Sequence, residues 1–207
     1  MRRKYLWLVA VAFAVIVFDQ WTKYLVLRDL TTGLDAAESH AAVFYGAAPE
    51  QGYDGYHFRS KEQVVLNDSF MRLRYAENPG AAFGLFRNLP ESARGPLFHL
   101  VSIGAVLLIG FSFSKLRGAA DERWARWGLP LVLGGAVGNY IDRLARGFVI
   151  DFMEPVWNGR AWWPAFNVAD TFIVVGVGLL VIDSFVRKEK KASTDGLVAA
   201  RGGKEAA

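Results

Sequence analysis

Apolar residues along this chain fall into four long blocks, and charged residues lie mostly between them. Each block is close to the roughly 20 residues that a helix needs to cross about 30 Å of hydrocarbon. The backbone of such a segment must satisfy its own hydrogen bonds, and the alternation typical of a membrane barrel is not visible. The pattern therefore predicts four membrane-spanning helices at about 5–27, 96–113, 127–144 and 167–186.

The segments outside these spans complete the predicted organisation. Residues of about 28–95 form an outer subdomain, in which 63–75 is typical of short strands and 89–94 of a short surface helix. Residues 1–191 are expected to form one mainly α membrane domain, a four-transmembrane-helix bundle with a small periplasmic or extracellular β-containing subdomain. The segment 192–207, rich in Ala, Gly and Lys, is expected to be a flexible cytoplasmic tail.

Basic residues predict the orientation of the bundle. They cluster before the first span, between the second and third, and after the fourth. Because short loops rich in Lys and Arg stay in the cytoplasm, both termini are predicted to be cytoplasmic, with 28–95 and 145–166 outside. A cleaved signal peptide would start similarly, but the first apolar run ends in Asp19-Gln-Trp-Thr-Lys23 without a small-x-small site. The net charge of +4 thus reflects orientation, and no nucleic-acid partner is expected.

Several kinds of chemistry have no support in the sequence. The chain has no cysteine, and its three histidines lack the spacing of a zinc site, so a zinc site is not expected. Nothing else in the sequence implies a metal or an organic cofactor. No serine or threonine has a suitably placed histidine or lysine, and no glycine-rich phosphate loop occurs. A nucleophilic triad and nucleotide chemistry are therefore disfavoured.

Polar residues of the predicted spans gather at one depth, just beneath the outer surface. Charged groups are costly inside a membrane, so each of them needs a reason to be there. The residues at this depth are Asp19 in the first span, Asn139, Asp142 and Arg143 in the third, Asp151 just beyond it, and Asp170 about one turn into the fourth. The common depth predicts a polar site with Asp151 and Asp170 as its central pair.

Some of these residues also have simpler interpretations. Asp19 and Lys23 are spaced i, i+4 and could form a local ion pair. Asp142 and Arg143 could neutralise each other within the bundle. Asp183, near the inner end of the fourth span, is expected to pair with the basic tail.

Asp151 and Asp170 could act together on a water molecule. Asp151 has apolar neighbours, whereas Asn167 is a natural N-cap that places Asp170 in the first turn of a helix. Two adjoining carboxyl groups share one proton, so the charged one can act as a general base and the neutral one can donate to a carbonyl. Carboxylates in a membrane can also relay protons or bind cations. An aspartic peptidase, a small proton- or cation-coupled transporter and a non-catalytic scaffold all remain open.

Five motifs, in order along the chain, resemble those of the lipoprotein signal peptidase (signal peptidase II) family. They are Asp19-Gln-Trp-Thr-Lys23, Asn78-Pro-Gly-Ala-Ala-Phe-Gly84, Gly134-Gly-Ala-Val-Gly-Asn-Tyr-Ile-Asp-Arg143, Val149-Ile-Asp-Phe152 and Phe166-Asn-Val-Ala-Asp170. The resemblance covers nearly the whole chain apart from the tail.

The resemblance implies an intramembrane aspartic endopeptidase that removes signal peptides from diacylglyceryl-modified bacterial prolipoproteins, cutting before the lipidated cysteine. It implies that Asp151 and Asp170 are catalytic. The expected location is the bacterial cell (inner) membrane, with the site near the outer leaflet and with prolipoprotein signal peptides and membrane phospholipids as partners. Substrate-binding roles are expected for Asn78, Gly80, Gly135, Asn139, Arg143 and Asn167, and supporting roles for Asp19, Lys23, Asp142, Phe166 and Ala169.

One region departs from the family pattern. Between about 31 and 63 the outer segment is longer than expected, with Phe44-Tyr45-Gly46 and Tyr53-Asp-Gly-Tyr56 within it. This insert could form an added hairpin or a flap.

Overall fold

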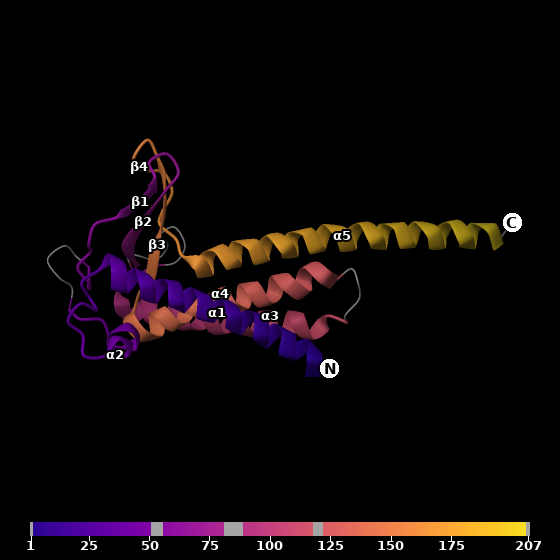
Figure 1. Ribbon diagram of the computed structural model, residues 1–207. Helices are drawn as coiled ribbons and strands as arrows, with labels where there is room; N and C mark the ends of the chain where they lie inside the picture. Colours follow the sequence, from indigo (N-terminus) through magenta and orange to yellow (C-terminus); the bar gives the residue numbers. More distant parts are fainter. Residues whose placement is uncertain (1, 51–55, 81–88, 118–121, 206–207) are drawn as a thin grey trace.

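The computed structural model describes residues 2–50, 56–80, 89–117 and 122–205, and it has helices alongside one another with a sheet at one end (Figure 1). The helices are α1 (Arg2–Leu30), α2 (His40–Tyr45), α3 (Glu91–Lys115), α4 (Arg123–Arg146) and α5 (Val168–Glu205). The strands are β1 (Val64–Asn67), β2 (Met71–Asn78), β3 (Val149–Trp157) and β4 (Arg160–Ala161). The sheet runs across the end of the bundle rather than along the helices (Figure 1).

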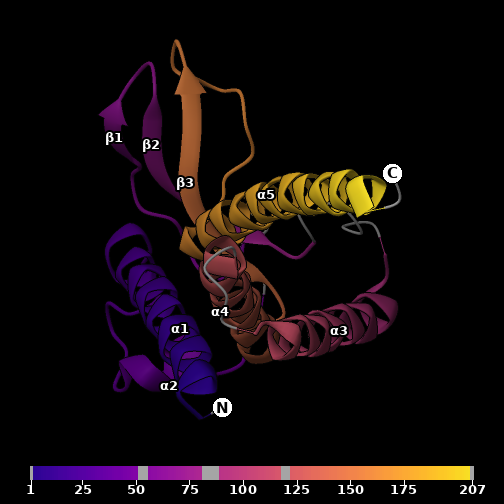
Figure 2. The same cartoon turned by 90° about the vertical axis from the view of Figure 1, so that its right-hand side faces the viewer.

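α4 lies among the other long helices and packs against α1, α3 and α5 (Figure 2). Glycines on two of its sides allow the close approach. A Cβ atom on Gly134 or Gly138 would lie 2.6 Å from atoms of α1, and one on Gly135 would lie 2.5 Å from the carbonyl oxygen of Ala169. Small residues let membrane helices bring their backbones together in this way.

Three helical segments of the described residues are long and apolar enough to cross a membrane: Arg3–Leu30, Ser92–Lys115 and Val168–Arg187. Large apolar side chains such as Leu6, Leu107 and Val174 are exposed on them, as expected of helices that face lipid. The fourth predicted span, 127–144, is helical within α4 but is not among these apolar segments. Its polar residues and glycines lower its hydropathy.

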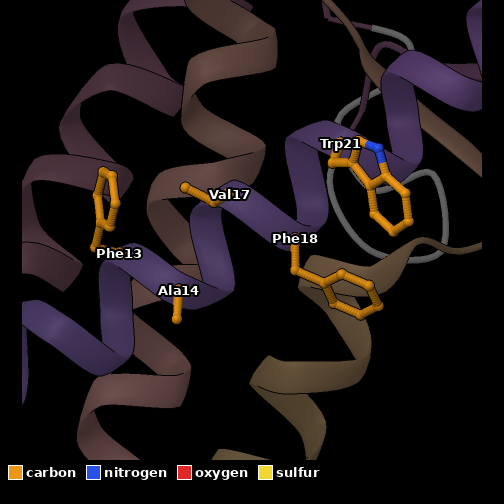
Figure 3. A pocket seen from close by; sticks show the side chains of 5 residues that line it. All are labelled: Phe13, Ala14, Val17, Phe18 and Trp21. Atoms are coloured by element: carbon orange, nitrogen blue, oxygen red, sulfur yellow. The ribbon is translucent and has the colours of Figure 1, made fainter.

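A shallow apolar groove follows the outward side of α1 (Figure 3). Its lining residues are Phe13, Ala14, Val17, Phe18 and Trp21. Phe18 also packs edge-on against Phe172 of α5, with ring centroids 6.3 Å apart. The groove has an apolar lining, so it suits lipid rather than polar chemistry.

The four strands form one antiparallel sheet in the order β1-β2-β3-β4. The prediction of short strands within 63–75 is confirmed by β1 and β2. The short helix predicted at 89–94 is wrong as a separate element, because α3 begins at Glu91 and continues to Lys115. Pro96 lies inside α3, near its start. Proline has no backbone N–H, so the carbonyl of Ser92, in the first turn of α3, lacks its usual helical hydrogen bond.

The insert between 31 and 63 packs against the sheet and the end of α1. Its ends are joined by a bridge between Thr31 and Ser60, and Phe44 of α2 belongs to a buried cluster with Tyr75 and Phe148. Residues 51–55, which include most of the predicted Tyr-Asp-Gly-Tyr feature, lie outside the described residues.

α5 continues to Glu205, well beyond the predicted end of the last span at 186. The segment 192–207, predicted to be a flexible tail, has helical backbone as far as Glu205. Ala, Lys and Glu are strong helix formers, which favours this continuation. The prediction for Asp183 is confirmed: its carboxylate lies 2.7 Å from Arg187 and also accepts the N–H of Ala125 in α4 at 3.1 Å.

Gly138→Ala tests the close packing of α1 on α4. The added Cβ would lie 2.6 Å from the carboxylate oxygen of buried Asp19. Overpacking of this kind costs about 1–3 kcal/mol, so the thermal unfolding midpoint of the purified protein should fall. Gly104→Ala in α3 is the control, because nothing lies within 4 Å of its Cβ position and alanine favours a helix. Equal midpoints for the two variants would contradict this role of Gly138.

Candidate active site

The first turn of α5 is built around Asn167 and Asp170. Oδ1 of Asn167 accepts the backbone N–H of Asp170 at 3.0 Å, and Oδ2 of Asp170 accepts the N–H of Asn167 at 3.2 Å. This reciprocal pair is a capping box with aspartate in place of the usual glutamate. The prediction of Asn167 as the N-cap is confirmed, and the bonds that start the helix also fix Asp170.

The amide nitrogen of Asn167 connects this turn to two other elements. Since Oδ1 serves the cap, Nδ2 is free to donate, and it does so to Asp151 at 2.7 Å and to Oδ1 of Asn139 at 3.1 Å. Asn139 then donates from its own Nδ2 to Oδ1 of Asp170 at 2.8 Å. Asn167 therefore contacts both aspartates directly, and Asn139 secures Asp170 from α4.

Asp151 lies in β3, opposite Ala76 of β2, and is 3% exposed. Its Oδ2 accepts Nδ2 of Asn78 at 2.9 Å, while Oδ1 accepts Asn167. Burial, and then the charge of Asp170, raise the pKa of Asp151 to about 7, although the two amide donors act in the opposite direction. Near neutral pH, Asp151 is therefore present in both protonated and ionised forms.

Four buried charged side chains form a network behind the two aspartates. Nζ of Lys23 lies 2.8 Å from Asp19 and 2.9 Å from Asp142, and Asp142 also pairs with Arg146. The two cations balance the two anions, which is the condition for burying such groups. The predicted Asp19–Lys23 pair is confirmed. The alternative pairing of Asp142 with Arg143 is wrong, because Asp142 turns to Lys23 and Arg146.

The same network holds the backbone beside each aspartate. Asp19 accepts the N–H of Ala169, the residue before Asp170, at 3.0 Å. Asp142 accepts the N–H of Ile150, the residue before Asp151, at 3.2 Å. In addition, Lys23 donates to Oδ1 of Asn139 at 2.9 Å. The buried charges thus position the neighbours of both candidate catalytic residues.

Arg143 and the start of the Asn78 motif lie on another side of the site. Oδ1 of Asn78 accepts the N–H of Gly80 at 3.0 Å, and the Gly80 carbonyl accepts Nη2 of Arg143 at 3.0 Å. The Arg143 guanidinium lies over the ring of Phe98 in α3, 4.5 Å from its centroid. These predicted substrate-binding residues are therefore brought together. Residues 81–84 of the motif lie outside the described residues.

Two other predicted residues have packing or backbone roles in the structure. Gly135 faces the Ala169 carbonyl, so it allows close packing of α4 on α5, and its predicted substrate contact stays a prediction. Phe166 pairs with Met153 through its backbone, with N–H to carbonyl distances of 2.9 and 3.0 Å, and so ties the approach to α5 onto β3.

Sequence reasoning missed Gln20 and Arg146. Gln20 donates to Asp142 at 2.9 Å and to the carbonyl of Gly138 at 3.2 Å. Arg146 donates to Asp142 and to the carbonyl of Phe44 in α2. The i, i+4 spacing of Asp142 and Arg146 could have indicated the role of Arg146 from the sequence. Within the described residues, no group of His, Cys, Asp or Glu side chains is arranged to hold a metal ion.

Residues 11–186 match the family model described as signal peptidase (SPase) II. The chain belongs to the signal peptidase II family. Relatives include the lipoprotein signal peptidase of Anaeromyxobacter sp. (strain Fw109-5), which is 46% identical over 180 residues, 84% of this chain and 83% of the relative. That of Syntrophus aciditrophicus (strain SB) is 40% identical over 171 residues, 83% of this chain and 99% of the relative. The predicted resemblance is confirmed.

Signal peptidase II is a protease family, so a hydrolytic role follows for this member. A bacterial membrane enzyme solved by the in meso method at 2.3 Å resolution is similar in fold, with a TM-score of 0.64 and 24% identity. The match covers 89% of this chain and 90% of that enzyme. The three long apolar helices of this family member indicate a membrane protein.

Asp151→Asn tests the raised pKa of Asp151. An aspartate in an unfolded chain has a pKa of about 3.9. Because the folded-state pKa is about 7, the native state holds the extra proton between these values and loses stability as the pH rises through them. Asn does not titrate, so the variant does not lose stability in this way. The thermal unfolding midpoint of the variant minus that of the wild type should therefore increase from about pH 5 to about pH 8.

Asp29→Asn is the control for this measurement. Asp29 is exposed, and its salt bridge with Arg28 lowers its pKa. Asp29 therefore titrates below the tested pH range in both the folded and the unfolded chain. Its difference from the wild type should be the same at both pH values. A pH-independent difference for Asp151→Asn as well would show that Asp151 does not carry a raised pKa.

Proposed function

We propose that this chain is an intramembrane aspartic endopeptidase in which Asp151 and Asp170 activate water to hydrolyse a peptide bond. The observation that carries the proposal is the network of asparagine hydrogen bonds that joins the two carboxylates. Asn167 contacts both of them, and Asn139 contacts Asp170 and Asn167. The two carboxylates repel each other when both are ionised, so one of them keeps a proton more readily, as an aspartic protease dyad requires.

The surroundings of the two aspartates favour different protonation states. Asp170 lies in the first turn of α5, where the helix dipole favours negative charge, and it accepts hydrogen bonds from Asn139 and from the N–H of Asn167. Asp151 is buried with a pKa raised to about 7, so it retains the shared proton more readily. Asp170 is therefore the general base of the resting enzyme, and Asp151 is the acid.

The reaction follows from that assignment. Asp170 takes a proton from water as the water oxygen attacks the scissile carbonyl carbon, and Asp151 donates its proton to the carbonyl oxygen. When the tetrahedral intermediate collapses, the proton on Asp170 passes to the leaving amine nitrogen and the C–N bond breaks. The new carboxyl group returns a proton to Asp151, so the dyad is restored. The peptide backbone of a substrate can meet Arg143 and the strand end at Asn78.

The substrate class comes from the relatives, which are named lipoprotein signal peptidases. We propose that this chain removes signal peptides from diacylglyceryl-modified prolipoproteins and cuts before the lipidated cysteine. The acyl chains of such a substrate stay in the bilayer, so its scissile bond lies near the membrane surface. The site lies at the end of the bundle where α4 ends at Arg146 and α5 begins at Val168, which suits this depth.

The proposal includes α4 as the fourth span, with both termini in the cytoplasm and the site toward the outer leaflet of the inner membrane. α4 is 24 residues long, enough to cross, and its Asn139 and Asp142 turn inward to Lys23 and Asp170 rather than to lipid. The basic clusters all lie at the end of the bundle opposite the site. Transporter sites use helices broken near mid-membrane. Here α1, α4 and α5 are continuous helices, and the polar residues gather at one end.

The direct test supplies the purified protein with a diacylated prolipoprotein and measures the released signal peptide by mass spectrometry. Asp151→Asn and Asp170→Asn should each lower the cleavage rate by about 10²–10⁴-fold, because each removes one partner of the proton transfers. Asp29→Asn, an exposed acid at the end of α1, should cleave like the wild type. Near-wild-type cleavage by either dyad variant would refute the mechanism, while failure of the wild type to cleave would refute the substrate class.

A further inference from the structure

The free end of the sheet carries exposed aromatic side chains that the proposed site does not use. Phe70, Trp157 and Trp162 are 68%, 65% and 64% exposed, and Trp163 is 44% exposed. We call these four residues the aromatic tip. A patch of large aromatic side chains on a protein surface marks a place where something else binds.

The aromatic tip is built by two hairpin ends held side by side. Val156 donates its N–H to the carbonyl of Phe70 at 3.1 Å, and Gly159 donates to the carbonyl of Asp68 at 3.0 Å. The turn between β3 and β4 is tight, with left-handed φ values of 49° at Asn158 and 72° at Gly159, as two-residue hairpin turns require. Phe70 and Trp157 are thus presented by two joined hairpins, and Trp162 follows β4, where its N–H donates to the carbonyl of Pro155 at 3.3 Å.

We propose that the aromatic tip is an interfacial anchor, which lies in the phospholipid headgroup region of the bilayer that the helices cross. The first reason is the chemistry of the side chains. Tryptophan collects at membrane–water interfaces, where its ring meets apolar chains and its N–H stays in a polar layer. Three of the chain's seven tryptophans are in the tip.

The second reason is the position of the tip along the chain. The apolar segment of α5 begins at Val168, five residues after Trp163. Five extended residues reach at most about 18 Å. Trp163 therefore lies within about that distance of the start of a membrane-crossing segment, and Trp162, one residue earlier, lies within about 22 Å of it.

The third reason is the direction of the sheet. It extends across the end of the bundle and past α5, as both views show (Figures 1 and 2). A sheet that crosses the helix direction lies along the plane of the membrane that the helices cross. Its free end then overhangs the lipid beside α5 instead of pointing into the aqueous phase.

The anchor has a consequence for the site, and this consequence rests on the proposed function. β3 carries Asp151 near one end and Trp157 at the other, six residues away, which is about 20 Å of strand. Holding Trp157 at the interface therefore fixes the depth of Asp151 relative to the lipid. A substrate whose cysteine is tethered by acyl chains requires the site at that constant depth.

The test uses the absence of cysteine in the chain. Trp162→Cys and, separately, Trp157→Cys are labelled with the fluorophore NBD and placed in phosphatidylcholine nanodiscs with or without lipids brominated on their acyl chains. Val174→Cys, on the lipid-facing side of α5, is the lipid reference, and exposed Glu38→Cys is the aqueous reference. Brominated lipids should quench both tip labels at least about twofold more than the label at 38.

Quenching of the tip labels no greater than at position 38 would overturn the proposal. A blue-shifted tip label without bromine quenching would also overturn it, since protein rather than lipid would then cover the tip. Because this measurement does not use cleavage, it succeeds or fails independently of the proposed function. The added consequence for the site is checked by Trp157→Ala/Trp162→Ala, which should cleave a bilayer-embedded precursor more slowly than the wild type at the same thermal unfolding midpoint.

Discussion

The balance of charge between Asp19, Lys23, Asp142 and Arg146 is the constraint on which the site depends. The first three side chains are fully buried, and Arg146 is 5% exposed. A charge in such a place is tolerated only when it is paired and its remaining hydrogen-bonding capacity is used. Both carboxylates meet this condition by binding Lys23 and a backbone N–H, and those N–H groups belong to the residues next to Asp170 and Asp151. The paired charges in the core thus hold the backbone beside Asp151 and Asp170 in place.

Asn167 extends the same logic to the two aspartates themselves. Oδ1 of Asn167 caps the N-terminus of α5, which fixes the direction of Nδ2, and Nδ2 donates a hydrogen bond to Asp151. Asn139, held by Lys23, completes the link to Asp170 from α4. Catalytic groups work best when their neighbours hold them in place before substrate arrives. The close helix packing at Gly138 is part of this support, because a larger residue would collide with Asp19.

Local patterns in the sequence predicted a good part of this arrangement. The shared depth of the polar residues, the N-cap at Asn167 and the i, i+4 pair of Asp19 and Lys23 all follow from short-range rules, and the structure has the capped turn and the ion pair. Short-range rules cannot predict which distant strands and side chains pair with each other. β3 is in register with β2 across more than 70 residues, which joins Asn78 to Asp151. Asp142 has a basic neighbour at 143, but consecutive residues on a helix point in different directions, so its partner had to come from the next turn and from α1.

The unfolding midpoint of Lys23→Met, with and without Asp19→Asn, tests the role of the buried charges most directly. Lys23→Met leaves the pair Asp142–Arg146 intact but strands the charge of Asp19, and breaking a buried pair in this way costs about 3–5 kcal/mol. The single variant should therefore unfold at a much lower temperature than the wild type. Lys23→Met/Asp19→Asn should recover much of the loss, because it restores neutrality while the amide oxygen can still accept the N–H of Ala169. A double variant no more stable than Lys23→Met would contradict charge balance as the source of this order.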